Sequence, residues 1–222
     1  MLLAFDTSSA AVTVALADPV TGAIVASSTT VDALRHGELL APAIDAALTQ
    51  AGCTPRDLTR IAVGVGPGPF TGLRVGLVTA RTMADVLGIE VAGVCSLDIL
   101  ARQSSLSLPV AVATDARRKE IYWALYDGPA ADGSRRRLEG PAVDKPADVA
   151  HVLKGLPIIG RGATLYAEAL GVSVDEVVEY PSAEVLAYGV ATGTLEIVAP
   201  DPLYLRRPDV TMSGGPKSVL TK

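Results

Sequence analysis

The part of the sequence that most constrains the fold is a glycine- and proline-rich loop, Gly64-Val65-Gly66-Pro67-Gly68-Pro69-Phe70-Thr71-Gly72-Leu73-Arg74. It follows a run typical of a buried strand, 59–65, and opens a long apolar helix over about 71–87 that Gly88 ends. Such a loop presents backbone N–H groups to an anion. It lacks the Gly-Lys-Ser/Thr ending of a P-loop, however, and its prolines remove amide donors. A rigid turn and an anion-binding loop therefore both remain open.

The helix that follows this loop has a small residue at every fourth position, namely Gly72, Gly76, Ala80 and Ala84. Small residues at this spacing form a smooth ridge along which another backbone can approach closely. Each interior glycine costs a helix roughly 0.5–1 kcal/mol relative to alanine. We therefore expect close packing to offset that cost, either within the chain or against a partner. The amphipathic helix predicted at 36–51 is the candidate neighbour within the chain.

Residue patterning predicts an α/β protein in two parts. The first part reads as strands at 2–7, 11–17, 22–29, 59–65 and 90–95 with helices at 36–51, 71–87 and 96–105. After a polar, proline-ended break, the second part reads as strands at 110–115, 119–127, 135–143 and 157–160 with helices at 147–154, 163–170 and 182–193. The last thirty residues are predicted to be extended. We place the boundary at residue 105, which divides the chain into 1–105 and 106–222.

Composition excludes several classes of function. The chain of 222 residues is 49% hydrophobic and 19% charged, which is typical of a soluble folded protein. A net charge of −5 provides no global basic field for nucleic acid, and 4% aromatics provide no base-stacking platform. No apolar run is long enough for a membrane helix, and two cysteines build neither a disulfide framework nor a zinc site. We therefore expect a cytoplasmic protein.

Two strand ends carry acidic and polar residues that are candidates for chemistry. Asp6-Thr7-Ser8 ends the first strand, where its hydroxyls and amides either face an anion or only form a hairpin turn. Asp115 ends a buried strand and is followed by the basic cluster Arg117-Arg118-Lys119, with a second cluster, Arg135-Arg136-Arg137, on the neighbouring strand. The two clusters form either a local positive patch or a solvated hairpin tip.

Histidine, serine and cysteine patterns support no catalytic residue. A helical metal site that begins at His36 needs a second ligand at position 40, where Leu40 stands. The other histidine, His151, falls in a different predicted helix of the other part, so we expect His36 to be a lone, hydrogen-bonded histidine and the chain to have no metal site. No Gly-x-Ser-x-Gly elbow or Cys–His pair is present.

Together, several motifs resemble the TsaB family, also called YeaZ. They are Phe5-Asp6-Thr7-Ser8-Ser9, His36-Gly37-Glu38-Leu39-Leu40-Ala41-Pro42, the loop 66–76, Ser96-Leu97, and Asp115-Ala116-Arg117 with Tyr122. Pro69 departs from the pattern, because the family usually has serine there. The resemblance implies the two-lobed fold of actin, hexokinase and Hsp70 (ASKHA), with mixed sheets flanked by helices. It also implies membership of the bacterial machinery that forms threonylcarbamoyladenosine (t6A) at position 37 of certain tRNAs.

This resemblance further implies a subunit without catalytic residues that heterodimerises with and activates the transferase TsaD. TsaD holds its metal with a His-x-x-x-His helix, which here ends in Leu40. The implied partner interface comprises His36, Leu39, Leu40, Ala43, Ile44, Ala47, Gly72, Val75, Gly76, Thr79, Ala80 and Met83. The expected partners are TsaD, the ATPase TsaE, tRNA through the complex, and a second copy when the chain is alone, with no membrane.

Nucleotide binding is the remaining expectation. The candidate nucleotide or anion loops contain Asp6, Thr7, Ser8, Gly66, Gly68, Thr71 and Asp115. The resemblance implies that these loops contain few of the glycines that nucleotide-binding members of the fold have there. We therefore expect no cofactor in the isolated chain and ATP or ADP only in the assembled complex. One alternative is a stand-alone ATP-dependent transferase or kinase of the same fold, in which Asp6 and Asp115 hold magnesium. A metalloprotease is the other alternative, and the unpaired His36 argues against it.

Overall fold

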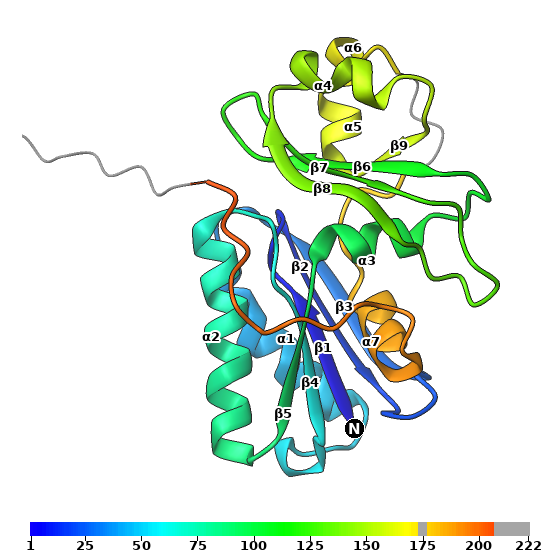
Figure 1. Cartoon of the computed structure of the whole chain (residues 1–222). Coiled ribbons are helices and arrows are strands. Elements are labelled where there is room, and N and C mark those ends of the chain that lie inside the picture. The colour runs from blue at the N-terminus through cyan, green and yellow to red at the C-terminus, as the bar shows by residue number, and fades with distance from the viewer. Residues whose placement is uncertain (173–176, 207–222) are drawn as a thin grey trace, which may run out of the picture.

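The computed structural model describes residues 1–172 and 177–206, which form two mixed β-sheets with helices packed against them (Figure 1). The first sheet has the strand order β3-β2-β1-β4-β5, with β1 at Leu2–Asp6, β2 at Ala11–Ala17, β3 at Ile24–Val31, β4 at Arg60–Gly64 and β5 at Glu90–Val94. β1 pairs antiparallel with β2 and parallel with β4. Every residue of β1 and β2 is buried, because helices cover both faces of the sheet.

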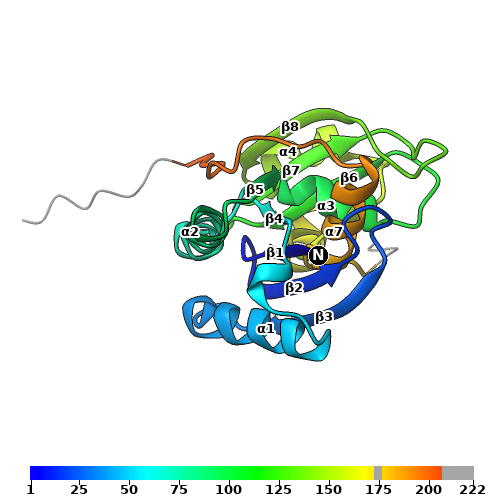
Figure 2. The same cartoon turned by 90° about the horizontal axis from the view of Figure 1, so that it is seen from below.

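Two long helices cover one face of the first sheet (Figure 2). α1 spans His36–Gln50 and α2 spans Phe70–Leu87, and a short 3₁₀ helix, η1 at Pro55–Asp57, precedes β4. Apolar side chains of both helices pack with alternate residues of the strands, so that Leu40 and Leu77 share a core with Phe5. Gly88 ends α2 in the left-handed conformation with φ at 67°, as its position after the periodic run predicts.

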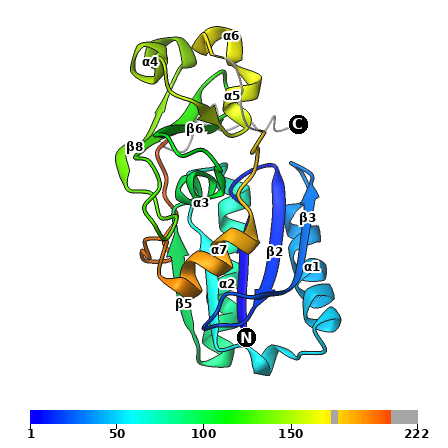
Figure 3. The same cartoon turned by 90° about the vertical axis from the view of Figure 1, so that its right-hand side faces the viewer.

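The second sheet has four described strands in the order β8-β7-β6-β9, with β6 at Val110–Asp115, β7 at Ile121–Tyr126, β8 at Arg137–Asp144 and β9 at Ile158–Ile159. Three short helices, α4 at Pro146–Leu153, α5 at Arg161–Leu165 and α6 at Ala167–Leu170, pack on its outer face (Figure 3). The order β8-β7-β6-β9 repeats the order β3-β2-β1-β4 of the first sheet, with the same parallel and antiparallel pairs. The two sheets are therefore built on one topology.

One helix lies between the two sheets. α3 at Ser96–Gln103 packs Ile99 against the first sheet, while Leu97 and Leu100 belong to the core of the second sheet. α7 at Ala183–Thr192 covers the rest of that face of the first sheet. The mixed-sheet α/β class expected from the sequence is confirmed.

The chain then returns across the first sheet toward the second as an extended segment, 196–206, which we call the C-terminal strap (Figure 1). Val198 forms a β-bridge with β5, and Tyr204 stacks on Phe70 at the start of α2 with ring centroids 4.3 Å apart. Farther along, Arg206 forms an ion pair with Glu120, next to β7. The strap thus ties the first sheet and α2 to the second sheet.

Two features differ from the sequence-based expectation. The helix predicted at 163–170 is two short helices, α5 and α6, with Tyr166 between them. The helix predicted at 182–193, which is α7, packs on the first sheet rather than completing the second part, because a helical repeat predicts a buried face without saying which sheet buries it. The boundary at residue 105 stays a prediction, and positions 207–222 of the predicted tail lie outside the described residues. In the part of the chain that the structure describes, no helix is both long and apolar enough to span a membrane.

Candidate functional site

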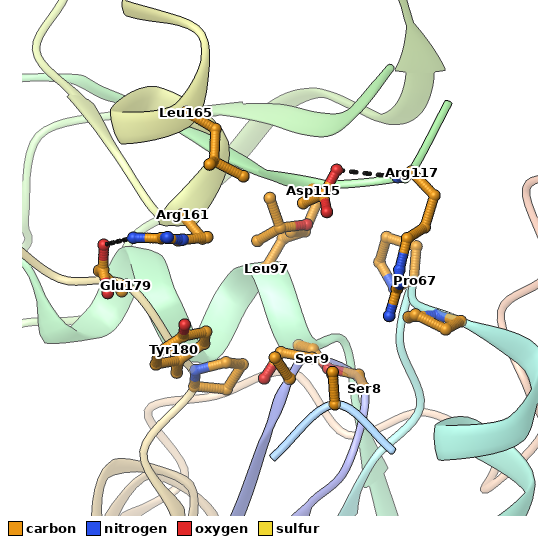
Figure 4. Close-up of a pocket in the computed structure, with 16 residues that line it drawn as sticks. Ser8, Ser9, Pro67, Leu97, Asp115, Arg117, Arg161, Leu165, Glu179 and Tyr180 are labelled. Atoms are coloured by element: carbon orange, nitrogen blue, oxygen red, sulfur yellow. Dashed lines mark hydrogen bonds and ion pairs between the residues drawn. The ribbon is translucent and has the colours of Figure 1, made fainter. Parts of the chain in front are cut away.

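A cavity of about 330 Å³ opens between the two sheets. Its lower wall is formed by Ser8 and Ser9 of the β1–β2 turn, Pro67 of the glycine-rich loop and Leu97 of α3 (Figure 4). Its upper wall is formed by Asp115, Arg117, Arg161 and Leu165, and Glu179, Tyr180 and Pro181 close one side. The lining combines apolar side chains with convergent polar and charged groups, as sites for small molecules do.

Of the seven residues predicted for nucleotide or anion loops, only Ser8 and Asp115 line this cavity. Asp6, Thr7, Gly66 and Gly68 are buried beneath its floor, and Thr71 is exposed on α2. Whether the cavity binds a nucleotide stays a prediction.

The Asp6 carboxylate is used entirely inside the chain. Its Oδ1 accepts hydrogen bonds from the Ser8 backbone N–H (2.8 Å) and the Ser8 hydroxyl (2.7 Å), and its Oδ2 accepts one from the Ser96 hydroxyl (2.6 Å). Burial raises the pKa of Asp6, and the hydrogen bonds from Ser96 and Ser8 oppose that increase. Because Asp6 is only 1% exposed and does not line the cavity, it does not fit the role of a magnesium ligand there.

Glycines of the predicted loop bring α2 directly onto the β1–β2 turn. A Cβ atom at Gly68 would lie 2.0 Å from the Ser8 carbonyl oxygen, and one at Gly72 would lie 2.2 Å from the Thr7 carbonyl oxygen. The Thr7 hydroxyl in turn donates to the Gly72 carbonyl oxygen at 2.8 Å. The loop therefore packs as a structural turn against Thr7 and Ser8, and the small side of α2 faces the interior of the chain.

His36 occupies the first turn of α1 and is 6% exposed. Its Nε2 donates to the Ser9 carbonyl oxygen at 2.7 Å, so the hydrogen bond expected for His36 is present. Within residues 1–172 and 177–206, no three His, Cys, Asp or Glu side chains come together in a way that could hold a metal ion.

Comparison with known proteins places this geometry in a family. The family model described as "TsaD: tRNA N6-adenosine threonylcarbamoyltransferase" matches residues 24–210. Two solved structures from Pseudomonas aeruginosa are similar to the chain: YeaZ (31% identity, TM-score 0.76), and a protein described as similar to peptidase YEAZ (32% identity, TM-score 0.77). Each comparison covers 92% of this chain and 99% of the other. The chain belongs to the TsaB/YeaZ family.

Sequence relatives agree with this assignment. An uncharacterized protein of Mycobacterium tuberculosis is 41% identical over 209 residues, which is 94% of this chain and 92% of that protein. The tRNA threonylcarbamoyladenosine biosynthesis protein TsaB of Bacillus subtilis is 35% identical over 129 residues, which is 56% of this chain and 54% of that protein.

The twelve residues of the partner interface that the TsaB/YeaZ resemblance implies divide into two sets. Seven of these residues are buried inside the chain and present no surface to a partner: His36, Leu40, Ile44, Ala47, Gly72, Gly76 and Ala80. The other five are half-buried and lie on the facing flanks of α1 and α2: Leu39, Ala43, Val75, Thr79 and Met83. We call these five the α1–α2 face, and for them the interface stays a prediction. Gly72 and Gly76 pack on Thr7, whereas the core of the first sheet contains Leu40, Ile44, Ala47 and Ala80.

The two basic clusters of this TsaB/YeaZ chain do not merge into one patch. Strand register pairs Arg137 with Tyr126 at one end of β7, whereas the cluster 117–119 precedes the other end. The arginines of 135–137 are used inside the chain. Arg136 pairs with Asp127, and Arg137 Nη2 lies 3.2 Å from carboxylate oxygens of both Asp98 and Glu196. Arg135 donates to the carbonyl oxygens of Leu106, Leu108 and Asp127.

Sequence reasoning missed the side of the cavity that the 178–181 segment forms. Arg161 Nη1 lies 2.5 Å from Glu179 Oε1, and this ion pair stands at the cavity edge beside Tyr180 (Figure 4). Backbone N–H groups of Gly160 and Arg161 also donate to carbonyl oxygens of this segment. No local pattern marks Glu179 and Tyr180, because their contact with Arg161 joins segments that are not adjacent in the sequence.

Proposed function

We propose that this protein is the non-catalytic subunit of a complex that forms N6-threonylcarbamoyladenosine in tRNA, and that it binds and activates a TsaD-type transferase through the α1–α2 face. The observation that carries the proposal is family membership combined with an uncharged, partly exposed face on two adjacent long helices. TsaB of Bacillus subtilis is described as a threonylcarbamoyladenosine biosynthesis protein. The TsaD family model also matches most of this chain, so a TsaD-type partner has a corresponding helix pair to offer.

The composition of the α1–α2 face supports a protein partner. None of its five residues is charged, and the outer surface of α2 adds Val78 and Val86, which are 61% and 80% exposed. Val75, Thr79 and Val86 follow the i, i+4, i+11 spacing that places residues on one flank of a helix. Exposed apolar side chains on one flank of a surface helix are typical of sites that bind another protein. In the absence of TsaD, we expect the same face to pair with a second copy of the chain.

Asp6 and His36, which would be catalytic or metal-binding candidates in a related enzyme, form hydrogen bonds within the chain, and this supports a non-catalytic role. The Asp6 carboxylate accepts three hydrogen bonds from Ser8 and Ser96 and lies outside the cavity lining. His36 donates to a backbone carbonyl and is followed four residues later by Leu40. We infer that the chain acts through its partner, with TsaE and tRNA joining the assembled complex.

Size-exclusion chromatography with light scattering tests the proposal on the full chain, alone and mixed with TsaD from the same organism. We expect a homodimer alone and a one-to-one heterodimer in the mixture. Val86→Glu should weaken the heterodimer at least about tenfold, because burying an unpaired carboxylate costs more than about 1.4 kcal/mol. The matched control is Val20→Glu in the β2–β3 turn, since Val20 is 76% exposed and Val86 is 80% exposed.

A heterodimer that is equally stable in both variants would rule out the flank of α2 that carries Val75, Thr79 and Val86, and with it the α1–α2 face as the interface. Failure of the wild-type chain to bind TsaD, or to stimulate its modification of tRNA, would rule out the function itself.

One observation favours the alternative of a stand-alone ATP-dependent transferase or kinase, namely the cavity between the two sheets. Calorimetric titration of the isolated chain with ATP and magnesium separates the two functions. Tight binding with turnover by the chain alone would move the enzyme to first place, while binding seen only with TsaD present agrees with a nucleotide held in the assembled complex.

A further inference from the structure

The turn that joins β6 to β7 contradicts local sequence preference. Its residues Arg117, Arg118 and Lys119 have φ values of 65°, 55° and 62°, all in the left-handed region. The Glu120 backbone N–H donates to the Arg117 carbonyl oxygen at 3.0 Å, which closes a tight turn around Arg118 and Lys119. Two central residues with positive φ are the positions where hairpins strongly prefer Asn-Gly, because a Cβ atom is unfavourable there. We call 117–119 the basic turn.

No contact within the described part of the chain explains why Arg117 and Lys119 are cationic. Among the described residues, the side chains of Arg117 and Lys119 form no hydrogen bond or ion pair. Both nearby carboxylates are engaged by other groups. Asp115 accepts from the Arg117 backbone N–H, and Glu120 pairs with Arg206 of the C-terminal strap. The basic turn therefore keeps exposed positive charge on a chain whose net charge is −5.

The second arginine cluster differs in this respect. Arg136 and Arg137 satisfy carboxylates of the chain itself, and those ion pairs explain their presence. Arg117 and Lys119 instead carry charge at positive-φ positions, where no described contact of their side chains uses that charge. Sites that break a local rule without a structural gain are where function is expected.

The position of the basic turn relates it to the α1–α2 face. Arg206, which pairs with Glu120 beside the turn, is two residues along the strap from Tyr204, and Tyr204 stacks on Phe70 in the first turn of α2. Arg117 also reaches from the turn toward Pro67 at the cavity mouth (Figure 4). The basic turn therefore lies near the N-terminal end of α2, beside the face proposed to bind TsaD.

We propose that Arg117, Arg118 and Lys119 form a contact site for backbone phosphates of the tRNA that the complex modifies. This inference rests on the proposed function and names the part of this chain that meets the RNA. Lysine and arginine bind phosphates with release of counterions, which gives affinity and fixes orientation without reading sequence. A chain that is acidic overall needs such a local site to meet RNA at all.

The experiment measures binding of a fluorescent tRNA transcript to the heterodimer of this chain with TsaD, at several KCl concentrations. The test variant is Arg117→Asn/Arg118→Asn/Lys119→Gly, whose residues suit positive φ. The control variant, Arg56→Asn/Arg136→Asn/Lys154→Asn, removes the same charge from other exposed sites. Light scattering on the same samples reports whether the heterodimer is intact.

We expect the test variant to bind tRNA at least about tenfold more weakly at low salt, with a log–log salt slope reduced by about 0.9 for each phosphate that the variant no longer neutralises. The control variant should keep nearly the wild-type slope. We also expect the test variant to unfold at a higher temperature than wild type, because it relieves the unfavourable φ values. A merely structural turn would not combine higher stability with weaker RNA binding.

Equal tRNA affinity and slope in an intact heterodimer of the test variant would overturn the inference while leaving the proposed function in place. Loss of the heterodimer in the test variant alone would also overturn it, by assigning the basic turn to an acidic surface of the partner. Absence of a wild-type heterodimer would instead overturn the proposed function, and the inference with it.

Discussion

The β1–β2 turn and the β6–β7 turn occupy equivalent positions in the two sheets, yet they have opposite surroundings. In each sheet the first strand ends in an aspartate whose Oδ1 accepts the backbone N–H two residues later: Ser8 N to Asp6 at 2.8 Å, and Arg117 N to Asp115 at 2.9 Å. Thr7 and Ser8 are buried, whereas Arg117, Arg118 and Lys119 are exposed. The same local hydrogen bond thus supports a packed turn in one sheet and a solvent-facing basic turn in the other.

The helix that follows the parallel strand explains this difference. After β4, the 18-residue helix α2 extends over the β1–β2 turn, where Gly72 and Gly76 contact Thr7. After β9, the start of the five-residue helix α5 packs differently, because Gly162 contacts Ala113 within strand β6 rather than the turn. One topology therefore yields a covered turn or an open turn according to where the start of the following helix packs. Three predictions, given in order of decreasing effect, test this explanation.

The largest effect should follow from a substitution that forces α2 away from the β1–β2 turn. Gly72→Ala places a Cβ atom 2.2 Å from the Thr7 carbonyl oxygen, so we expect the free energy of unfolding to fall by about 2–3 kcal/mol. Gly37→Ala in the first turn of α1 is the matched control, because the nearest atom to its added Cβ, a Val75 methyl, lies 3.9 Å away. It should stabilise the protein by up to ~1 kcal/mol. Urea denaturation measures the free energy of unfolding of both variants. If Gly72→Ala raised it as much as Gly37→Ala, the close contact of α2 with the β1–β2 turn would be contradicted.

An intermediate effect concerns pH and the buried carboxyl group of the first turn. Burial raises the pKa of Asp6 in the folded chain above its value of ~3.9 in the unfolded chain. The folded chain therefore binds the proton more tightly, and the contribution of Asp6 to stability is fully present below the unfolded pKa and is lost as pH rises through the folded pKa. Asp6→Asn keeps an acceptor for Ser8 and cannot ionise.

Between the pKa of Asp6 in the unfolded chain and its pKa in the folded chain, the free energy of unfolding of wild type should fall by about 1.4 kcal/mol per pH unit relative to Asp6→Asn. Above the folded-state pKa, the difference between the two proteins should be constant. Urea denaturation of both proteins across pH 4–8, taken as differences so that other groups cancel, measures this. A difference that is flat with pH would show that burial does not raise the pKa of Asp6 in the folded chain.

The smallest effect should come from the open turn. Because the left-handed conformation is unfavourable for residues with a Cβ, Lys119→Gly alone should raise the free energy of unfolding by roughly 1 kcal/mol. Ser8→Gly in the covered turn should lower it, since the Ser8 hydroxyl donates to Asp6. Thermal denaturation of the two variants side by side checks the contrast, and a loss of stability in Lys119→Gly would show that the basic turn is not strained.

Much of the fold is predictable from local patterns. The bounds of α2 follow from an apolar run between a proline-rich loop and Gly88, which caps it with positive φ. The strand order of the first sheet is not predictable in the same way, but its strands and their burial are. His36 as a hydrogen-bonded histidine also follows from the sequence, because Leu40 occupies the position of the second metal ligand.

Other features depend on contacts between distant segments. The ridge of Gly72 and Gly76 is visible in the sequence, but its partner, Thr7, lies more than sixty residues away and no periodicity identifies it. Likewise, Arg137 reads as part of a basic cluster until strand pairing brings it to Asp98 and Glu196.

Local sequence therefore determines which segments are helices and strands, where they end, and to which family the chain belongs. These properties depend on spacing and on backbone preferences that act over a few residues. Which side of α2 faces inward, which arginines are neutralised, and which of two equivalent turns stays exposed are settled only when the chain packs. Burial and charge pairing of a residue depend on which other residues lie next to it in the folded chain. Those neighbours are often distant in the sequence, so packing of the whole chain determines them.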